Sequence, residues 1–138
     1  MNYSRPSLDQ TYMDMAEVLS HRSSCNKKQV GCLIVKDNSI IAEGYNGTPS
    51  GWSNDCEDEH GHTKDCVSHA EANAISKLAK GTRSSTGSTV YCTLSPCYDC
   101  AKQLADCGIT RFVFKETYRN ASGIHYLTER GIKVDKHE

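Results

Sequence analysis

The sequence contains no long run of apolar residues and no excess of charge of either sign. Its 16 Lys and Arg residues oppose 17 Asp and Glu residues, which gives a formal net charge of −1 at neutral pH. Proteins that bind nucleic acids or acidic membranes through charge need a basic excess, so we expect neither class of partner. No segment reaches the ~18 to 20 apolar residues of a membrane span, and residues 1–6 contain no apolar core of a signal peptide. The expected location is therefore the cytoplasm, or the host cytoplasm for a viral protein.

Internal repeats, linkers and low-complexity segments are also missing from the chain. The chain has 138 residues. A chain of this size buries about two-thirds of its surface on folding, which is enough for one hydrophobic core. We therefore expect a single domain over residues 1–138.

Cysteine, by contrast, is frequent, with eight residues in the chain. Each must be a disulfide partner, a metal ligand or a buried thiol. In a reducing cytoplasm, closely spaced cysteines are more often metal ligands or redox pairs than disulfides. Cys32, Cys92 and Cys107 lie within or beside predicted helices and strands, and we expect them to be buried as small apolar side chains.

Helices and strands are expected to alternate along the chain. From Leu8 to Leu19 apolar residues recur at helical spacing, with Met15 among them. Ser95 and Pro96 are typical of a helix start, as the N-cap and the first helical residue. The order predicts a three-layer α/β/α domain with a mixed five-stranded sheet whose later strands are parallel. The expected helices are 8–19, 68–80, 97–106 and 122–130, and the expected strands are 29–36, 40–45, 88–94, 111–115 and 132–134.

Two short motifs open two of these helices, His69-Ala70-Glu71 and Pro96-Cys97-Tyr98-Asp99-Cys100. Zinc accepts His nitrogen and Cys sulfur, and catalytic sites commonly combine three protein ligands with one water. His69, Cys97 and Cys100 supply three such ligands, and the two cysteines are three residues apart on one helix face. Glu71 points to a different side, where it can exchange protons as a general acid and base.

Each motif alone has a simpler interpretation. A lone CxxC is also typical of redox pairs, and a lone HxE also occurs at exposed helix starts. Together, each at a strand-to-helix junction, they match the H-x-E and P-C-x-x-C signature of zinc nucleobase deaminases. We therefore predict a catalytic zinc rather than a redox pair.

With Gly44-Tyr45-Asn46-Gly47 and Arg22-Ser23-Ser24-Cys25, these motifs make residues 8–134 resemble the zinc-dependent cytidine/deoxycytidylate deaminase superfamily. Within it, the resemblance is to the deoxycytidylate (dCMP) deaminases of phage and bacteria. The resemblance implies a cytidine-deaminase-like fold and hydrolysis of dCMP to dUMP and ammonia, which feeds dTTP synthesis. In this mechanism Glu71 takes a proton from the water that zinc activates and delivers protons to N3 and to the leaving amine.

The substrate-binding residues implied by the resemblance are Asn46, Arg22, Tyr118, Ala70 and Ser95. Asn46 would contact a sugar hydroxyl, and Arg22 would meet the 5′-phosphate, which a guanidinium can bind through two hydrogen bonds. Simpler roles stay open for three of them. Asn46 also suits a left-handed turn, Arg22 a solvated helix end, and Tyr118 a packing position.

The polar segment from Cys56 to Cys66 contains His60 and His62 in a C-x3-H-x-H-x3-C pattern. Phage-type relatives are similar in that a second zinc ties the position of Cys25 to this loop. By this resemblance we expect a structural zinc on Cys25, Cys56, Cys66 and His62, with His60 as the alternative to His62, and so two zinc ions per chain. The simpler alternative is free thiols and two unattached histidines.

Regulation and assembly are implied by the resemblance alone. The dCMP deaminases are typically homohexamers that dCTP activates and dTTP inhibits, with Mg²⁺, at a shared site that includes Gly44, Tyr45, Asn46 and Gly47. The expected partners are thus dCMP, the two triphosphates and further copies of the chain. The alternatives are a deaminase of free cytidine, deoxycytidine, guanine or tRNA adenosine, and, from another class, a zinc-stapled binding module without turnover. A net charge of −1 argues against the tRNA substrate.

Overall fold

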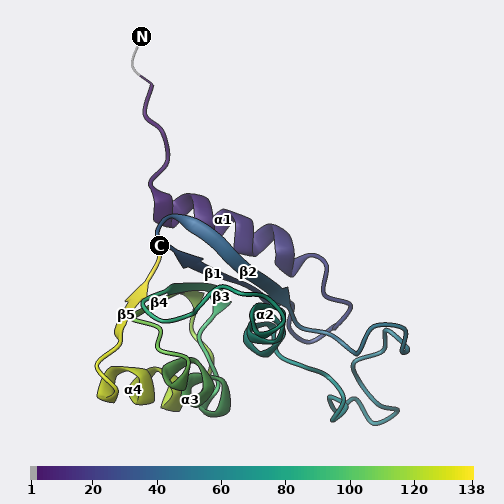
Figure 1. Ribbon diagram of the computed structural model, residues 1–138. Helices are drawn as coiled ribbons and strands as arrows, with labels where there is room; N and C mark the ends of the chain where they lie inside the picture. The colour runs from purple at the N-terminus through teal and green to yellow at the C-terminus, as the bar shows by residue number, and fades with distance from the viewer. Residues whose placement is uncertain (1–2) are drawn as a thin grey trace.

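The computed structural model describes residues 3–138, so Met1 and Asn2 of the single domain expected over the whole chain lie outside the described residues. Helices and strands alternate along this part of the chain in the expected order (Figure 1). Within residues 3–138, no helix is both long and apolar enough to cross a membrane. The helices are α1 (Leu8–Ser20), α2 (Ala70–Ala79), α3 (Tyr98–Asp106) and α4 (Ser122–Glu129), and the strands are β1 (Gly31–Lys36), β2 (Ser39–Tyr45), β3 (Thr89–Leu94), β4 (Arg111–Glu116) and β5 (Lys133–Lys136).

The five strands form one mixed sheet in the order β2-β1-β3-β4-β5. Strand β1 pairs antiparallel with both β2 and β3, whereas β3 with β4 and β4 with β5 are parallel. The β1–β2 hairpin turns through Asp37 and Asn38, which both have positive φ, as a tight hairpin turn requires. The predicted mixed sheet with parallel later strands is confirmed.

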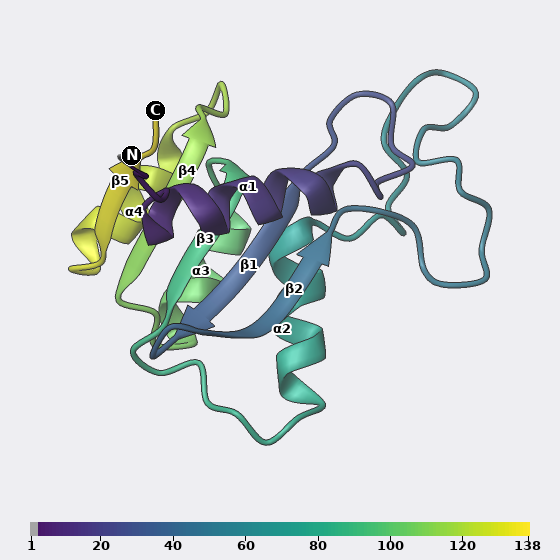
Figure 2. The same ribbon diagram turned by 90° about the horizontal axis from the view of Figure 1, so that it is seen from above.

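Helix α1 covers one face of the sheet, and α2, α3 and α4 cover the other (Figures 1 and 2). On the α1 face, Met13 and Ala16 pack against Leu33 and Tyr91 of the sheet. Met13 takes the buried position that the sequence pattern assigned to Met15, which is 41% exposed. The three-layer prediction is confirmed. The other face buries a larger set from all three of its helices and the sheet, including Ala70, Ala74, Leu104, Leu127, Ile34, Cys92 and Phe112.

The start of α3 differs from the expected one. Its N-cap is Cys97, whose sulfur accepts a hydrogen bond from the backbone N–H of Cys100 at 3.4 Å. Ser95, the expected N-cap, instead accepts a hydrogen bond at its Oγ from the backbone N–H of Tyr118 at 2.6 Å. The Ser95 prediction was wrong because its hydroxyl joins the end of β3 to the segment that follows β4.

The longest connection, residues 46–69 between β2 and α2, contains no helix or strand and projects beyond the sheet (Figure 2). An isolated backbone bridge joins Glu57 to Thr63 within it. A disulfide between Cys25 and Cys56 joins it to the segment that follows α1. A loop of this length needs such attachments because it has little apolar surface to bury.

Candidate active site and metal centre

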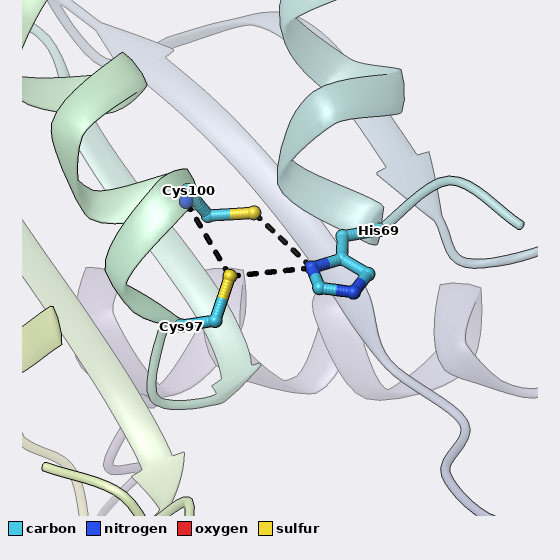
Figure 3. A group of neighbouring side chains, drawn as sticks. All are labelled: His69, Cys97 and Cys100. Carbon is cyan, nitrogen blue, oxygen red and sulfur yellow. Dashed lines mark hydrogen bonds between the residues drawn. The ribbon is translucent and has the colours of Figure 1, made fainter. Parts of the chain in front are cut away.

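Three potential zinc ligands meet where α2 and α3 begin, as Figure 3 shows. His69 is the N-cap residue of α2, Cys97 is that of α3, and Cys100 lies in the first turn of α3. Nδ1 of His69 lies 3.3 Å from Sγ of Cys100 and 3.5 Å from Sγ of Cys97. Nitrogen and sulfur ligands on one tetrahedral zinc are roughly 3.5 to 3.8 Å apart at normal bond lengths. The three residues therefore fit a single zinc ion.

The protonation states of this group also suit a cation. Hydrogen bonds from Cys100 and from His69 lower the pKa of the Cys97 thiol to about 4. The Cys97 thiolate in turn raises the pKa of His69, and hydrogen bonding to Cys97 together with burial raises the pKa of the Cys100 thiol. The lowered pKa of Cys97 favours its thiolate, and a divalent cation would displace the protons that remain on Cys100 and His69, because metal ligands bind deprotonated.

Glu71 lies in the first turn of α2 and is only 4% exposed. Burial raises the pKa of its carboxyl group to about 7. A group whose pKa is close to neutral takes up and releases protons with little energetic cost at physiological pH. The position and pKa of Glu71 therefore suit proton transfer beside the zinc ligands.

His69, Cys97 and Glu71 line a cavity of about 570 Å³. This volume is within the usual range of small-molecule sites, about 300 to 1,000 Å³. The cavity wall is drawn from α2, from the β3–α3 connection, from the segments that follow α1 and β4, and from the 46–69 loop. A small molecule in this cavity would contact the buried carboxyl group and the zinc ligands together.

Three basic residues of the cavity wall were not predicted from the sequence, namely Lys27, Lys28 and Arg119. The signals for them were weak: the two lysines lie in a polar stretch a few residues after Arg22, and Arg119 follows Tyr118. They give the cavity a local positive charge that the net charge of −1 conceals.

Most of the predicted substrate-binding residues line this cavity, including Ala70, Ser95 and Tyr118. Arg22 is the exception, because it is not among the lining residues. Its guanidinium carbon lies 5.8 Å from the centre of the Tyr45 ring, in a cation–π contact. Arg22 therefore lies outside the lining of the cavity, whereas Lys27, Lys28 and Arg119 lie in it, and the predicted contact of Arg22 with a phosphate stays a prediction.

Asn46 also lines the cavity, but its side chain already bonds the backbone. Its Oδ1 accepts a hydrogen bond from the N–H of Val30 at 2.9 Å, and its Nδ2 donates one to the carbonyl of Lys28 at 2.8 Å. Asn46 is absent from the described non-glycine residues with positive φ, so it is not a left-handed turn residue. It holds the segment that carries Lys28 in place, and its predicted contact with a sugar hydroxyl stays a prediction.

The residues expected to bind a second zinc are not assembled as predicted. The sulfurs of Cys25 and Cys56 are bonded to each other, so neither is a thiolate. The third potential ligand within reach of both sulfurs is the carboxylate of Glu57, which no motif indicated. The disulfide corrects two expectations from the sequence. One was that metal ligands are more common than disulfides in this chain, and the other was that Cys25 and Cys56 bind zinc.

The other expected ligands of that site lie elsewhere on the loop. The side chains of His60 and His62 are 73% and 78% exposed. Their backbone N–H groups both donate to Oδ1 of Asp58, at 2.8 and 2.9 Å, which closes a turn. Neither histidine nor Cys66 belongs to the group around Cys25 and Cys56, so the four expected ligands do not converge on one point in this structure.

The Gly44–Gly47 segment has structural tasks within the chain. A Cβ atom on Gly44 would lie 2.5 Å from the carbonyl oxygen of Ala70, so only glycine lets α2 pack this closely on β2. Gly47 forms a backbone bridge with Ser68, which brings the loop back to the start of α2. The segment therefore fixes where α2, and with it His69, begins.

Comparison with known proteins agrees with this site. Residues 6–116 match the family model described as the cytidine and deoxycytidylate deaminase zinc-binding region. The deoxycytidylate deaminase of Saccharomyces cerevisiae is 35% identical over 94% of this chain, which spans 45% of that enzyme's length. That of Enterobacteria phage T4 is 35% identical over 90% of this chain and 86% of its own length.

Among solved structures, the dCMP deaminase of the cyanophage S-TIM5, in complex with dCMP and dUMP, is similar over 98% of this chain and 100% of its own. The TM-score is 0.93 and the sequence identity is 43%. The match to the family model covers the zinc-ligand cluster, the buried glutamate and most of the sheet. The chain belongs to the cytidine and deoxycytidylate deaminase family.

Proposed function

We propose that the protein hydrolyses the 4-amino group of dCMP and so forms dUMP and ammonia, supplying dUMP for dTTP synthesis. One observation carries this proposal. A single cavity is lined by a buried carboxyl group, by two residues of the three-residue zinc-ligand cluster and by three basic residues, which are the groups that a deaminase of a phosphorylated pyrimidine needs.

His69, Cys97 and Cys100 would hold a zinc ion, which supplies Lewis-acid activation of a water molecule. Glu71 accepts a proton from the attacking water, because its carboxylate is buried against the same cavity. The same carboxyl group delivers this proton to N3. It then takes a second proton from the hydroxyl group added at C4 and passes it to the amino group, which leaves as ammonia. A pKa of about 7 lets Glu71 act first as base and then as acid.

Lys27, Lys28 and Arg119 bind the 5′-phosphate in this proposal. A phosphate monoester carries nearly two negative charges at neutral pH, and a guanidinium can bind two of its oxygens. Asn46 holds the backbone around Lys28 through its two hydrogen bonds. This basic wall favours a nucleotide over a free nucleoside or guanine.

The proposal is tested by measuring ammonia release from dCMP, deoxycytidine, cytidine, guanine and a tRNA with adenosine at the wobble position. We expect kcat/KM for dCMP to exceed that for deoxycytidine by at least about a hundredfold, because deoxycytidine lacks the phosphate and forms none of its charge-assisted hydrogen bonds. Equal turnover of deoxycytidine would reject the phosphate recognition. Activity on guanine or tRNA only would reject the substrate. No turnover of any substrate, with zinc bound, would favour the zinc-stapled binding module.

Zinc content, regulation, assembly and location complete the proposal, and the last three rest on the family resemblance. In the disulfide form we propose one zinc per chain, on the His69 cluster, since Cys25 and Cys56 are bonded to each other. Activation by dCTP, inhibition by dTTP with Mg²⁺, a homohexamer and a cytoplasmic location follow the resemblance. Initial rates with each triphosphate, with and without Mg²⁺, and light scattering of the purified protein test regulation and assembly.

A further inference from the structure

Ser95 lies at the corner between β3 and α3, and its hydroxyl reaches the segment that follows β4. Ser95 is only 3% exposed. Its Oγ accepts a hydrogen bond from the backbone N–H of Tyr118 at 2.6 Å. Ser95 and Tyr118 both line the cavity, so this hydrogen bond joins two parts of its wall.

The backbone of Ser95 is itself held in place. Its N–H donates to the carbonyl of Glu116 at 2.9 Å, which continues the pairing of β3 with β4 beyond Leu94. The following residue, Pro96, disfavours a helical backbone at Ser95 and favours an extended one. The hydroxyl therefore projects from a fixed point at the end of β3.

The segment that it contacts, residues 117–119, has few other attachments. These residues lie between β4 and α4 in neither helix nor strand, and all three line the cavity. Within residues 3–138, the hydrogen bond to Ser95 is the only one that any of the three forms. Arg119 also takes part in none of the ion pairs of that part of the chain. Because no side chain orients Arg119, the backbone at Tyr118 determines where its guanidinium can reach.

Helix α4, which follows this segment, approaches the same corner. A Cβ atom on Gly123 would lie 2.2 Å from the carbonyl oxygen of Pro96, so the close approach requires glycine. Both ends of the segment are thus placed relative to residues 95 and 96. The next residue, Cys97, belongs to the zinc-ligand cluster. One corner of the chain therefore positions both a metal ligand and the segment that carries Arg119.

We propose that Ser95 is a positioning residue for phosphate recognition, because its hydroxyl holds the Tyr118 backbone where Arg119 can meet the phosphate of the nucleotide. This inference rests on the proposed function, in which Arg119 binds the 5′-phosphate. Ser95 acts through Arg119 and does not itself touch the phosphate. A nucleotide then binds without first ordering residues 117–119, which would otherwise weaken its affinity.

The first test is amide hydrogen exchange of the zinc-loaded protein, followed by NMR. In wild type the amide of Tyr118 should exchange at least about 10-fold more slowly than those of Thr117 and Arg119, since it alone is hydrogen-bonded. Ser95→Ala should remove this difference, and Ser95→Thr, which keeps the hydroxyl, should retain it. Equal exchange at the three amides of wild type would overturn the inference without any variant.

Steady-state kinetics on dCMP and deoxycytidine then separate positioning from direct contact. For Ser95→Ala we expect KM for dCMP to rise by about 3- to 10-fold, as for the loss of one hydrogen bond, with kcat changed by less than about twofold. The value of kcat/KM for deoxycytidine, which has no phosphate, should change by less than about twofold. In an Arg119→Ala background, Ser95→Ala should raise KM by less than about twofold, because no guanidinium is left to position.

The matched control is Ser88→Ala, at the other end of β3. Ser88 is also buried, but its Oγ has no hydrogen-bond partner among residues 3–138 and it does not line the cavity. Its removal should leave KM and kcat for dCMP unchanged, whereas Ser95→Thr should keep KM within about twofold of wild type.

Two kinetic results would overturn the inference. One is a Ser95→Ala effect that is equal on dCMP and deoxycytidine, and the other is an effect that adds in full to that of Arg119→Ala. If Ser95→Ala does not fold, amide exchange in wild type and Ser95→Thr still decides whether the hydroxyl holds the segment. Absence of dCMP turnover by wild type would instead reject the proposed function.

Discussion

The two parts of the cavity wall are built by different means. The chemical part consists of side chains at the first residues of α2, which packs closely on Gly44 of β2, and of α3, which follows β3. The other part, which carries Lys27 and Lys28 and is called the recognition part after the proposed function, lies on irregular segments that a disulfide and single hydrogen bonds hold together. In the proposed function, chemistry is thus placed on the packed helix starts, whereas substrate selection is placed on the loops.

The strongest test of the chemical part is Glu71→Gln. The amide keeps the shape of the side chain but cannot transfer the proton, so we expect kcat to fall by about 10² to 10⁴. Zinc content and melting temperature should stay close to those of wild type. Glu129→Gln, on the exposed end of α4, serves as the control and should keep full activity. A Glu71→Gln enzyme with wild-type kcat would contradict the mechanism.

Removing the basic wall should act on binding rather than on chemistry. For the double variant Lys28→Ala with Arg119→Ala we expect KM for dCMP to rise by about 10- to 100-fold, since two charged hydrogen-bond donors to phosphate are lost. Turnover at saturation should change by less than about threefold. Arg83→Ala is the control, because Arg83 is exposed and does not line the cavity. A fall in kcat at unchanged KM would place these residues in the chemical part instead.

Loss of the Cys25–Cys56 disulfide should loosen the recognition part alone. We expect Cys25→Ser with Cys56→Ser to raise KM by about 3- to 10-fold, because Lys27 and Lys28, which bind the phosphate in the proposed function, lose their fixed positions. The melting temperature should fall, since the crosslink closes a loop with a sequence separation of 31.

Cys66→Ser is the matched control for the disulfide, as Cys66 is a free cysteine of the same loop. Metal analysis should give one zinc per chain for the serine double variant, for Cys66→Ser and for the oxidised wild type. A second zinc that Cys66→Ser removes would restore the four-ligand site expected from the sequence. An unchanged KM in the double variant would show that the loop is held by other contacts.

The smallest effects are expected on the α1 face, outside both parts of the wall. Arg111 donates to both carboxylate oxygens of Asp9 at 2.8 Å, and this guanidinium lowers the pKa of Asp9 from 3.8 to about 2. A carboxyl group whose pKa is lower in the folded state stabilises the fold above its unfolded pKa. That contribution is lost as the pH falls from about 4 to about 2.

Asp9→Asn should therefore lower the melting temperature at pH 7 by about 2 to 5 °C, because the ion pair is partly solvated. The difference from wild type should shrink below pH 3, and kcat and KM for dCMP should not change. Thermal denaturation across pH 2 to 7 measures this. A difference that stays constant with pH would assign the effect to packing rather than to charge.

The success of prediction from the sequence also differs between the chemical part and the recognition part. The His69, Cys97 and Cys100 cluster was predictable because short spacing at helix starts leaves few possible geometries. Met15 and Ser95 were given roles that belong to Met13 and Cys97, each two residues away. Either residue satisfied the local pattern, and tertiary contacts decided between them. Glu57 had no signal, because its place in the wall depends on a turn, a bridge and a disulfide between distant residues.

The N-cap of α3 has a consequence for how the enzyme acquires its metal. The sulfur of Cys97 both begins the helix and lies within ligand distance of His69, so one atom belongs to the backbone scaffold and to the metal centre. The position of this sulfur is thus fixed by the fold of the β3–α3 corner, because the backbone N–H of Cys100 already donates to it. Removal or exchange of the metal should then leave the first turn of α3 folded.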